Sequence, residues 1–443
     1  MPYLVHSPED RAAMLAELGI ETLEPLLADI PARLRLRRLN LADGLSEAET
    51  MARLRELAGR NAVFEDRLTF RGGGVYRRFI PAAVPAVTSK SEFYTAYTPY
   101  QPEASQGWLQ ATFEFQTMIA ELTAMDVSNA SLYDGATAVA EAAAMAVVQT
   151  GRDRVLVAGY LHPEYLEVLN TYARGRKFHV LQKLPQSGVI DPGELGEQLD
   201  RTVAAVIFQQ PNFLGLIEDA QALTDAAHQA GALAVACVDP ISLALLQPPG
   251  EYGADIAVGE GQQLGLTPSY GGPHLGFIAC RNELVRRLPG RLVGESKDAQ
   301  GRRGFVLTLQ AREQHIRRDK ATSNICTNHA LCALAATVYL SYMGPDGLRD
   351  IAQTSLTRSH HLERRLAGLG GFRPAFPEAA FVNEFPVRVE AGDGLLSRLQ
   401  EVGILGGLPV GRWFPELEGV LVFCCTELND PGAIETLLEA CGK

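Results

Sequence analysis

A short polar motif, Asp134-Gly135-Ala136-Thr137, leads directly into an alanine-rich segment that is predicted to be a helix. The start of a helix presents free backbone N–H groups and the positive end of the helix dipole, and both suit a phosphate. Asp134 could instead cap a buried helix, and on the local sequence alone the cap is favoured. The motif therefore predicts either a phosphate site or a capped helix.

A second acidic position, Asp239-Pro240, follows an apolar segment that is predicted to be a strand. An aspartate at the end of such a strand could face a bound heterocycle and keep its ring nitrogen protonated. It could equally cap a turn before Ile241, because Asp-Pro commonly opens a turn. The sequence leaves these two roles open.

Three tyrosines, Tyr94, Tyr97 and Tyr100, recur at intervals of three residues and enclose Thr98. The prolines at 99 and 102 disfavour a regular helix through this segment. A loop that carries aromatic rings and hydroxyl groups suits either the wall of a site or an interface between subunits.

Three further motifs have ordinary explanations beside functional ones. The glycine triplet that follows Arg71, in residues 71–74 (RGGG), is interpreted as a flexible turn rather than a phosphate loop. The YGGPH loop at 270–274 is interpreted as a structural turn before a strand. The basic cluster 312–318 predicts a solvated helix face with a Glu313–Arg317 pair, or else arginines beside a site for carboxylates or phosphates.

The elements that would position these residues alternate between helices and short apolar strands from residue 113 to about 287. This alternation predicts an α/β fold, a mostly parallel sheet sandwiched by helices, with ligands beyond the carboxyl ends of the strands. The predicted helices are 113–125, 137–149, 163–173 and 219–230, and the predicted strands are 155–158, 204–208, 232–238, 256–258 and 277–280.

The two ends of the chain have different patterns. Helix starts at Ser7-Pro8 and at Ser46, the latter with Glu49 in a capping box, predict an N-terminal helical segment over 1–85. Residues 336–443 predict a small C-terminal α+β domain beside a large domain over 86–335. Its predicted elements are helices 348–369, 394–402 and 431–441 and strands 381–389 and 420–425.

Composition excludes several classes of protein. Hydrophobic residues make up 47% and charged residues 21%, which is ordinary for a globular protein, and the net charge of −12 argues against nucleic acid or an anionic membrane as partner. No apolar run approaches the ~20 residues of a membrane helix, and the N-terminus lacks the pattern of a signal peptide. The seven cysteines have no metal-ligand spacing, so we expect reduced structural thiols, no metal site and a cytoplasmic location.

Taken together, long strings of this sequence resemble the glycine cleavage system P-protein, and more narrowly the first chain of the form that some bacteria split in two. The resemblance covers essentially the whole chain. It implies the fold of type I pyridoxal-phosphate transferases, an αβ or (αβ)₂ assembly, and glycine decarboxylation with aminomethyl transfer to the lipoyl arm of the H-protein. The strings are TAYTPYQPEASQG (95–107), NASLYDGATAVAEA (129–142), PPGEYGADIAVGEGQQLG (248–265), YGGPH (270–274), LPGRLVG (288–294) and REQHIRRDKATSNICTN (312–328).

One residue type is missing where the resemblance requires it. Pyridoxal phosphate is held as a Schiff base by a lysine near the end of a strand, yet this sequence has no lysine from 184 to 296. Gln262 or Gln263 stands where the family's cofactor-bearing chain has its lysine, and an amide cannot form an imine. The resemblance thus implies a vestigial cofactor pocket on this chain, made of Asp134, Gly135, Thr137, Asp239, Gln262 and Gln263.

Three classes of function follow from this reading. In the first, the chain is the half of a heteromeric enzyme that lacks the cofactor, paired with a homologous subunit 2 that holds pyridoxal phosphate, and Tyr97, Thr98 and Tyr100 reach the partner's site. In the second, it is an autonomous pyridoxal enzyme such as an aminotransferase, against which the missing lysine argues. In the third, it is a regulatory binding protein derived from the fold, which the residues alone leave open.

Overall fold

The computed structural model describes residues 5–36, 40–63, 67–390 and 392–442, which form two compact units, Met1–Ala62 and Val63–Lys443. The first unit contains helices α1 (Pro8–Glu17) and α2 (Glu47–Ala58), with short 3₁₀ turns at Glu24–Leu27 and Ala32–Leu34. Both predicted helix starts are confirmed, since Ser7 with Asp10 and Ser46 with Glu49 form capping boxes. No side chain described in this unit is buried.

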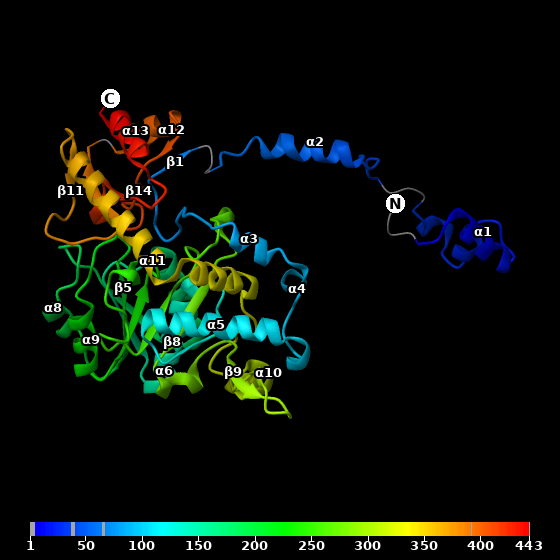
Figure 1. The fold of residues 1–443 in the computed structure, drawn as a ribbon, viewed down its shortest axis with the longest axis horizontal. Coiled ribbons are helices and arrows are strands. Elements are labelled where there is room, and N and C mark those ends of the chain that lie inside the picture. Colours follow the sequence, from blue (N-terminus) through cyan, green and yellow to red (C-terminus); the bar gives the residue numbers. More distant parts are fainter. Residues whose placement is uncertain (1–4, 37–39, 64–66, 391, 443) are drawn as a thin grey trace. The chain divides into compact units, whose positions relative to one another are not determined.

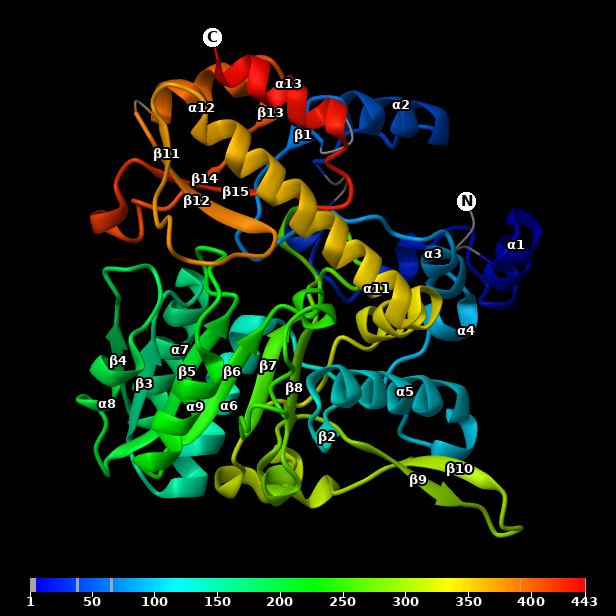
Figure 2. The same ribbon diagram turned by 60° about the vertical axis from the view of Figure 1, so that its left-hand side comes forward.

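The centre of the second unit is a seven-stranded sheet in the order β2-β8-β7-β6-β5-β3-β4 (Figures 1 and 2). The five strands from β7 to β4 run parallel. At one edge of the sheet, β8 pairs antiparallel with both β7 and β2. The predicted mostly parallel sheet is therefore confirmed. The strands are β2 (Val127–Ser128), β3 (Arg154–Ala158), β4 (His179–Lys183), β5 (Val203–Gln210), β6 (Leu233–Val238), β7 (Ile256–Glu260) and β8 (Gly276–Cys280).

Helices cover both faces of this sheet, because alternate strand residues enter two separate cores. Leu156 and Phe208 face a core shared with helices on one side, whereas Val157 and Ile207 face a core on the other. The first core contains α5 (Gln106–Thr123), α8 (Pro192–Gly196), α9 (Ala220–Gln229) and the start of α11, and the second contains α6 (Gly135–Thr150) and α7 (Pro163–Arg176).

Strand β4 and a hairpin of β9 (Val293–Lys297) and β10 (Arg303–Leu307) were not predicted. β9 has no apolar run, and the runs in β4 and β10 are only two and three residues long. β4 lies at the edge of the sheet and has no buried residue, and only one residue in each strand of the hairpin is buried. Edge strands of this kind leave little trace in hydrophobicity.

The C-terminal region forms an antiparallel sheet in the order β11-β12-β15-β14, packed against helices as predicted for an α+β domain. The helices are α12 (Gly392–Glu401) and α13 (Pro431–Cys441), and the strands are β11 (Phe372–Pro374), β12 (Glu384–Val389), β14 (Leu408–Pro409) and β15 (Val420–Cys424). A parallel pair, β1 (Leu68–Thr69) with β13 (Ile404–Leu405), joins Leu68 and Thr69 to this domain.

The helix predicted over 348–369 is the second half of a longer helix, α11 (Ala330–Ala367), which runs from the large sheet to the C-terminal domain (Figure 2). The helix is kinked at Gly344, whose φ is 61°, and Pro345 follows directly. The predicted boundary at residue 335 therefore falls inside a continuous helix. Short helices α3 (Ala83–Thr88) and α4 (Ser91–Tyr94) precede α5, and α10 (Gln314–Arg317) precedes α11.

All seven cysteines have free thiols, and six of them are buried, including the Cys424–Cys425 pair in and after β15. No helix in the described residues is long and apolar enough to span a bilayer.

Candidate functional site

The start of α6 is closed by two carboxylates of the chain itself. Asp134 caps the helix, since its Oδ1 accepts a hydrogen bond from the N–H of Thr137 at 2.7 Å. The N–H of Gly135 donates to Oε2 of Glu260 at 2.9 Å. The capping role of Asp134 is thus confirmed, and a carboxylate already occupies the place where an anion would bind a helix terminus.

Glu260, at the end of β7, is a buried carboxylate with three backbone donors. Besides Gly135, the N–H groups of Gln262 and Leu275 donate to its Oε1 at 2.9 and 2.8 Å. Burial raises the pKa of Glu260 to about 7, although these hydrogen bonds favour the charged form. The space around it is full, because a Cβ on Gly135 would lie 2.5 Å from the hydroxyl of Tyr165.

Asp239 caps a turn at the end of β6. Its Oδ1 accepts from the N–H groups of Ile241 and Ser242 at 2.8 and 3.2 Å, and its carbonyl accepts from the Ser242 hydroxyl at 2.8 Å. Of the two roles that the sequence left open, this geometry is that of the turn cap. Burial raises the pKa of Tyr76 well above its usual value, and the charges of Glu384 and Asp239 act in the same direction.

The amide of Gln262 is fully buried and makes three hydrogen bonds. Its Oε1 accepts from the N–H of Tyr76 at 2.9 Å, and its Nε2 donates to the carbonyls of Tyr76 at 3.0 Å and Leu266 at 2.8 Å. The side chain at the position where the resemblance implies a lysine thus binds backbone that precedes the large domain in sequence.

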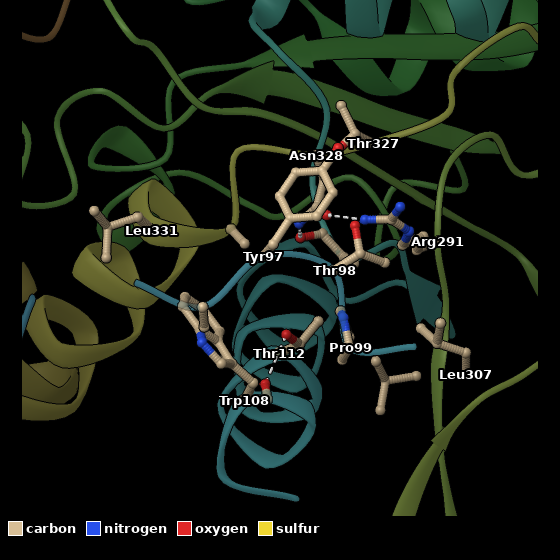
Figure 3. Close-up of a pocket in the computed structure, with 14 residues that line it drawn as sticks. Tyr97, Thr98, Pro99, Trp108, Thr112, Arg291, Leu307, Thr327, Asn328 and Leu331 are labelled. Carbon is tan, nitrogen blue, oxygen red and sulfur yellow. Dashed lines mark hydrogen bonds between the residues drawn. The ribbon is translucent and has the colours of Figure 1, made fainter. Parts of the chain in front are cut away.

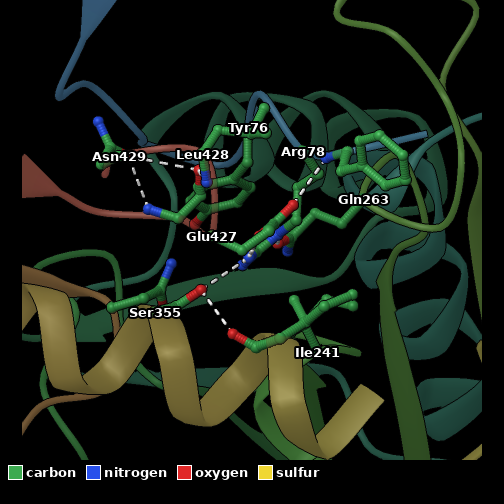
Figure 4. Close-up of polar contacts among 12 residues, drawn as sticks. Tyr76, Arg78, Ile241, Gln263, Ser355, Glu427, Leu428 and Asn429 are labelled. Atoms are coloured by element: carbon green, nitrogen blue, oxygen red, sulfur yellow. Dashed lines mark hydrogen bonds and ion pairs between the residues drawn. The ribbon is translucent and has the colours of Figure 1, made fainter. Parts of the chain in front are cut away.

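The neighbouring Gln263 points to a different partner in the same segment (Figure 4). Its Oε1 accepts from Nε of Arg78 at 2.7 Å. The Arg78 guanidinium also donates to the Ser355 hydroxyl at 3.0 Å and forms an ion pair with Glu427 at 2.7 Å. The side chains of Arg78 and Glu427 are both largely buried. Through these contacts Arg78 links the large sheet to α11 and to the C-terminal domain.

We name residues 71–79 the strap, since the segment passes between the sheet of the large domain and the C-terminal domain. Glu384 of β12 accepts from the N–H of Gly73 at 2.7 Å and from the Tyr76 hydroxyl at 2.6 Å. A Cβ on Gly72 would lie 2.1 Å from Glu384 Oε1, so this position has no room for a side chain. The prediction of a flexible turn at the glycine triplet was wrong, because tertiary hydrogen bonds hold it in place.

His162, at the start of α7, also contacts the strap and was missed at the sequence level. Its Nδ1 accepts from the N–H of Glu164 at 3.2 Å, so its Nε2, 3.0 Å from the Gly73 carbonyl, carries the proton. Burial lowers the pKa of His162, which agrees with a neutral ring. A His-Pro pair at the start of the predicted helix 163–173 was the only signal for it in the sequence, whereas Glu384 had none.

The structure brings the six residues of the predicted vestigial pocket to one end of the large sheet, around the strap. They do not fit a covalently held pyridoxal phosphate on this chain. Gln262 cannot form the Schiff base, its amide is saturated by Tyr76 and Leu266, and the N–H of Gly135 is taken by Glu260. No lysine lies between 183 and 297 to replace it.

The tyrosine loop lies elsewhere, beside a cavity of about 190 Å³ (Figure 3). Tyr94, Tyr97 and Tyr100 are 69–78% exposed, and the rings of Tyr97 and Tyr100 lie 6.4 Å apart. Tyr97 and Thr98 line the cavity together with Arg291 and other residues, but none of the six vestigial-pocket residues does. The structure therefore separates the two predicted sets of site residues.

The basic cluster forms a second cavity, of about 350 Å³, which includes Arg317. The half-buried Arg312 donates to the backbone carbonyls of Leu309 and Gly290, both at 3.1 Å, and so has a structural role. The predicted solvated helix face is present only as α10, a single exposed turn. Oε2 of Glu313 lies 3.5 Å from Nδ1 of His315.

Comparison with known proteins places this geometry in one family. The family model for the glycine cleavage system P-protein matches residues 1–438. The chain is 50% identical over 444 residues to the probable glycine dehydrogenase (decarboxylating) subunit 1 of Desulforamulus reducens, covering 100% of this chain and 99% of the relative. It is also 50% identical over 442 residues to the same subunit of Moorella thermoacetica, covering 99% of each chain.

Solved structures agree. The crystal structure of an inhibitor-bound glycine decarboxylase (P-protein) of the glycine cleavage system has a TM-score of 0.89 and 45% identity, covering 100% of this chain and 99% of that one. A sphingosine-1-phosphate lyase of Burkholderia pseudomallei, at 15% identity and a TM-score of 0.66 over 94% of both chains, shares the fold alone. The fold is that of type I pyridoxal-phosphate enzymes, and the chain belongs to the glycine cleavage system P-protein family.

Proposed function

We propose that this chain is the half of a heteromeric glycine decarboxylase that lacks the cofactor. A homologous subunit 2 would hold pyridoxal phosphate, and the pair would decarboxylate glycine and transfer the aminomethyl group to the lipoyl arm of the H-protein. Bound on the partner, the cofactor supplies the electron sink for decarboxylation. The relatives that support this proposal are named as subunit 1 of such an enzyme.

The observation that carries the proposal is the pairing of Gln262 with Tyr76. Both hydrogen-bonding ends of the amide are used by the strap at 2.9 and 3.0 Å, so the residue stabilises the fold of this chain and has no free nucleophile. A chain of this family with such a residue needs another chain for the covalent chemistry.

We propose further that Tyr97, Thr98 and Tyr100 contribute to the partner's site. The phenol rings of both tyrosines are largely exposed, and Pro99 restricts the backbone between them, so less ordering entropy is lost when they bind. The alternative is that the rings only pack in the interface between subunits, where tyrosine is common.

Reduction with borohydride tests the main proposal. The chain alone and the coexpressed pair are incubated with pyridoxal phosphate, reduced, digested and analysed by mass spectrometry. We expect no stoichiometric phosphopyridoxyl lysine on any of the six lysines of this chain and one on subunit 2. A stoichiometric adduct on this chain would overturn the proposal and favour an autonomous pyridoxal enzyme.

Glycine-dependent release of CO₂ separates the proposal from a purely regulatory role. We expect activity, measured with lipoylated H-protein, only when both chains are present. Full activity of subunit 2 alone would assign this chain a regulatory role instead.

A further inference from the structure

The cavity beside Tyr97 is built from segments that are distant in the sequence. The loop 96–99 forms one wall, and α5 contributes Trp108 and Thr112. Arg291 and Val293 lie on the segment that enters β9, and Asn328 precedes α11 (Figure 3). We name it the Arg291 pocket. At about 190 Å³ it is smaller than the ~300 Å³ at which pockets for drug-sized ligands begin, so only a small molecule or a single chemical group fits.

Two polar atoms beside this pocket have no partner. The Thr98 hydroxyl and the indole N–H of Trp108 are both buried, and neither has a hydrogen-bond partner in the described part of the chain. Buried polar groups are rarely left in this state, because desolvation without a new hydrogen bond is costly. The indole N–H can only donate and the Thr98 hydroxyl can donate as well, so an acceptor would satisfy both.

The third donor carries a full charge. The Arg291 guanidinium is half-buried, and its only side-chain hydrogen bond within the described part of the chain is a long one of 3.4 Å from Nη1 to Oδ1 of Asn328. No carboxylate in residues 5–36, 40–63, 67–390 or 392–442 lies within ion-pair distance of it. Charged side chains that leave water normally have a counter-charge.

The orientation of Asn328 is fixed by its own contacts. Its Nδ2 donates to the Ala130 carbonyl at 3.0 Å and to the Ser131 hydroxyl at 3.1 Å, which turns Oδ1 toward Arg291. Asn328 therefore positions the guanidinium without neutralising it. A guanidinium held in this way retains donors for a bidentate contact.

We propose that the Arg291 pocket binds a small anionic group, a carboxylate or a phosphate, between the donors of Arg291, Thr98 and Trp108. The inference goes beyond the proposed function, because it assigns a binding site to this chain's own residues whether or not Tyr97 and Tyr100 act in catalysis. An anion at this position would supply the acceptors that both orphaned donors lack and the counter-charge that Arg291 lacks.

The chain contains its own probe, since it has only two tryptophans, Trp108 and Trp413. Trp413 lies in the C-terminal domain, under the guanidinium of Arg412 at 3.6 Å and edge-on to Phe213 at 5.6 Å. The full chain is labelled with 5-fluorotryptophan, and Trp413→Phe assigns the two ¹⁹F resonances. Spectra are recorded for the chain alone and bound to unlabelled subunit 2, in sodium acetate and in sodium phosphate titrations at constant ionic strength with sodium chloride.

We expect a saturable shift of the Trp108 resonance with at least one of the two anions, while the Trp413 resonance stays in place. Saturation by acetate alone identifies a carboxylate site, and saturation by phosphate alone identifies a phosphate site. In Arg291→Gln the apparent affinity should fall at least tenfold. The matched control, Arg287→Gln, removes an arginine from the cavity of about 350 Å³ beside the basic cluster and should leave the titration unchanged.

If neither anion produces a saturable shift, the proposal is overturned and the pocket holds only water. A shift that Arg291→Gln leaves unchanged would overturn it as well. The position of the Trp413 resonance reports that each variant is folded. Because the titration measures binding and not turnover, its failure is distinct from a failure of the proposed decarboxylase function.

Discussion

The side-chain amide of Gln262 pairs with the backbone of Tyr76 in the way that one strand pairs with another, through an accepted bond of 2.9 Å and a donated bond of 3.0 Å. The two residues are 186 positions apart in the sequence. Where a family resemblance places the lysine of a cofactor-bearing chain, this chain has a residue that fixes the strap. In this chain the position has a structural role.

Replacing Gln262 tests this relationship. Gln262→Ala leaves the buried N–H and carbonyl of Tyr76 without partners, and we expect the free energy of unfolding to fall by about 2–4 kcal/mol. Chemical denaturation of the coexpressed pair, followed by circular dichroism, measures it. Gln353→Ala, on the exposed side of α11, is the control and should cost less than ~0.5 kcal/mol. Equal effects of the two substitutions would contradict the role of the pair.

The strap should also make stability depend on pH. Burial raises the pKa of Glu384 from its ordinary value of 4.5 to about 7, so between these values the folded state holds a proton that the unfolded state has released. The stabilisation that the protonated Glu384 carboxyl provides is therefore complete below pH 4.5 and is lost as the pH rises to 7. Relative to Glu384→Gln, which does not titrate, the wild type should lose about 2 kcal/mol between pH 5 and pH 8.

Denaturant titrations of the two proteins at pH 5 and pH 8 give this difference. Comparing the variant with the wild type at each pH cancels the titration of all other groups. A difference that does not change with pH would show that the Glu384 carboxyl titrates at its ordinary value.

The buried ion pair of Arg78 and Glu427 should be sensitive to the loss of one partner. Glu427→Gln leaves the guanidinium with a neutral partner and weakens the 2.7 Å contact, and we expect a loss of about 3 kcal/mol in unfolding free energy. Replacing both residues by apolar ones, as in Arg78→Met with Glu427→Leu, should cost less than the sum of the single changes. A double-mutant cycle measures this coupling. Strict additivity would mean that the pair is uncoupled.

Hydroxyl deletions in the tyrosine loop distinguish a role in the partner's site from simple packing. Tyr97→Phe and Tyr100→Phe keep the rings, so assembly with subunit 2 should survive. If a hydroxyl stabilises a charged substrate or transition state, kcat/KM for glycine decarboxylation should fall about tenfold or more, the scale of a charge-assisted hydrogen bond. Gel filtration checks assembly separately. Full activity in both variants would leave the loop as packing.

The isolated chain should not behave as a stable free monomer. An obligate interface buries ~2,000 Å² or more and is apolar at its centre, so we expect self-association of the chain alone and a defined complex with subunit 2. Sedimentation velocity of each chain and of the mixture measures this. A stable monomer that forms no complex with subunit 2 would contradict the heteromeric assignment.

Sequence patterns predicted the parts of the fold whose signal is local. Strands β5 and β6 appear as apolar runs because both of their faces are buried, and the capping boxes at Ser7 and Ser46 depend on residues three positions apart. Strand β4 was missed because it lies at the sheet edge and its exposed residues alternate with half-buried ones. The first half of α11, which ends at the kink at Gly344, was not predicted.

The candidate site was predictable only in part, because its contacts join distant segments. The caps of Asp134 and Asp239 are local and were among the alternatives considered. Glu260, Glu384 and His162 gain their importance from partners 89 to 311 residues away, for which hydrophobicity and spacing carry no signal. The glycine triplet was misinterpreted for the same reason, since glycine marks both a loose turn and a close approach of backbone.

The strap also has a mechanical consequence. It is bound to the large sheet through Gln262 and Gln263 and to the C-terminal domain through Glu384 and Glu427, and α11, which is kinked at Gly344, spans both domains. A hinge motion that opened these two domains would have to break several buried hydrogen bonds and an ion pair at once. The large domain and the C-terminal domain are therefore held stiffly against each other.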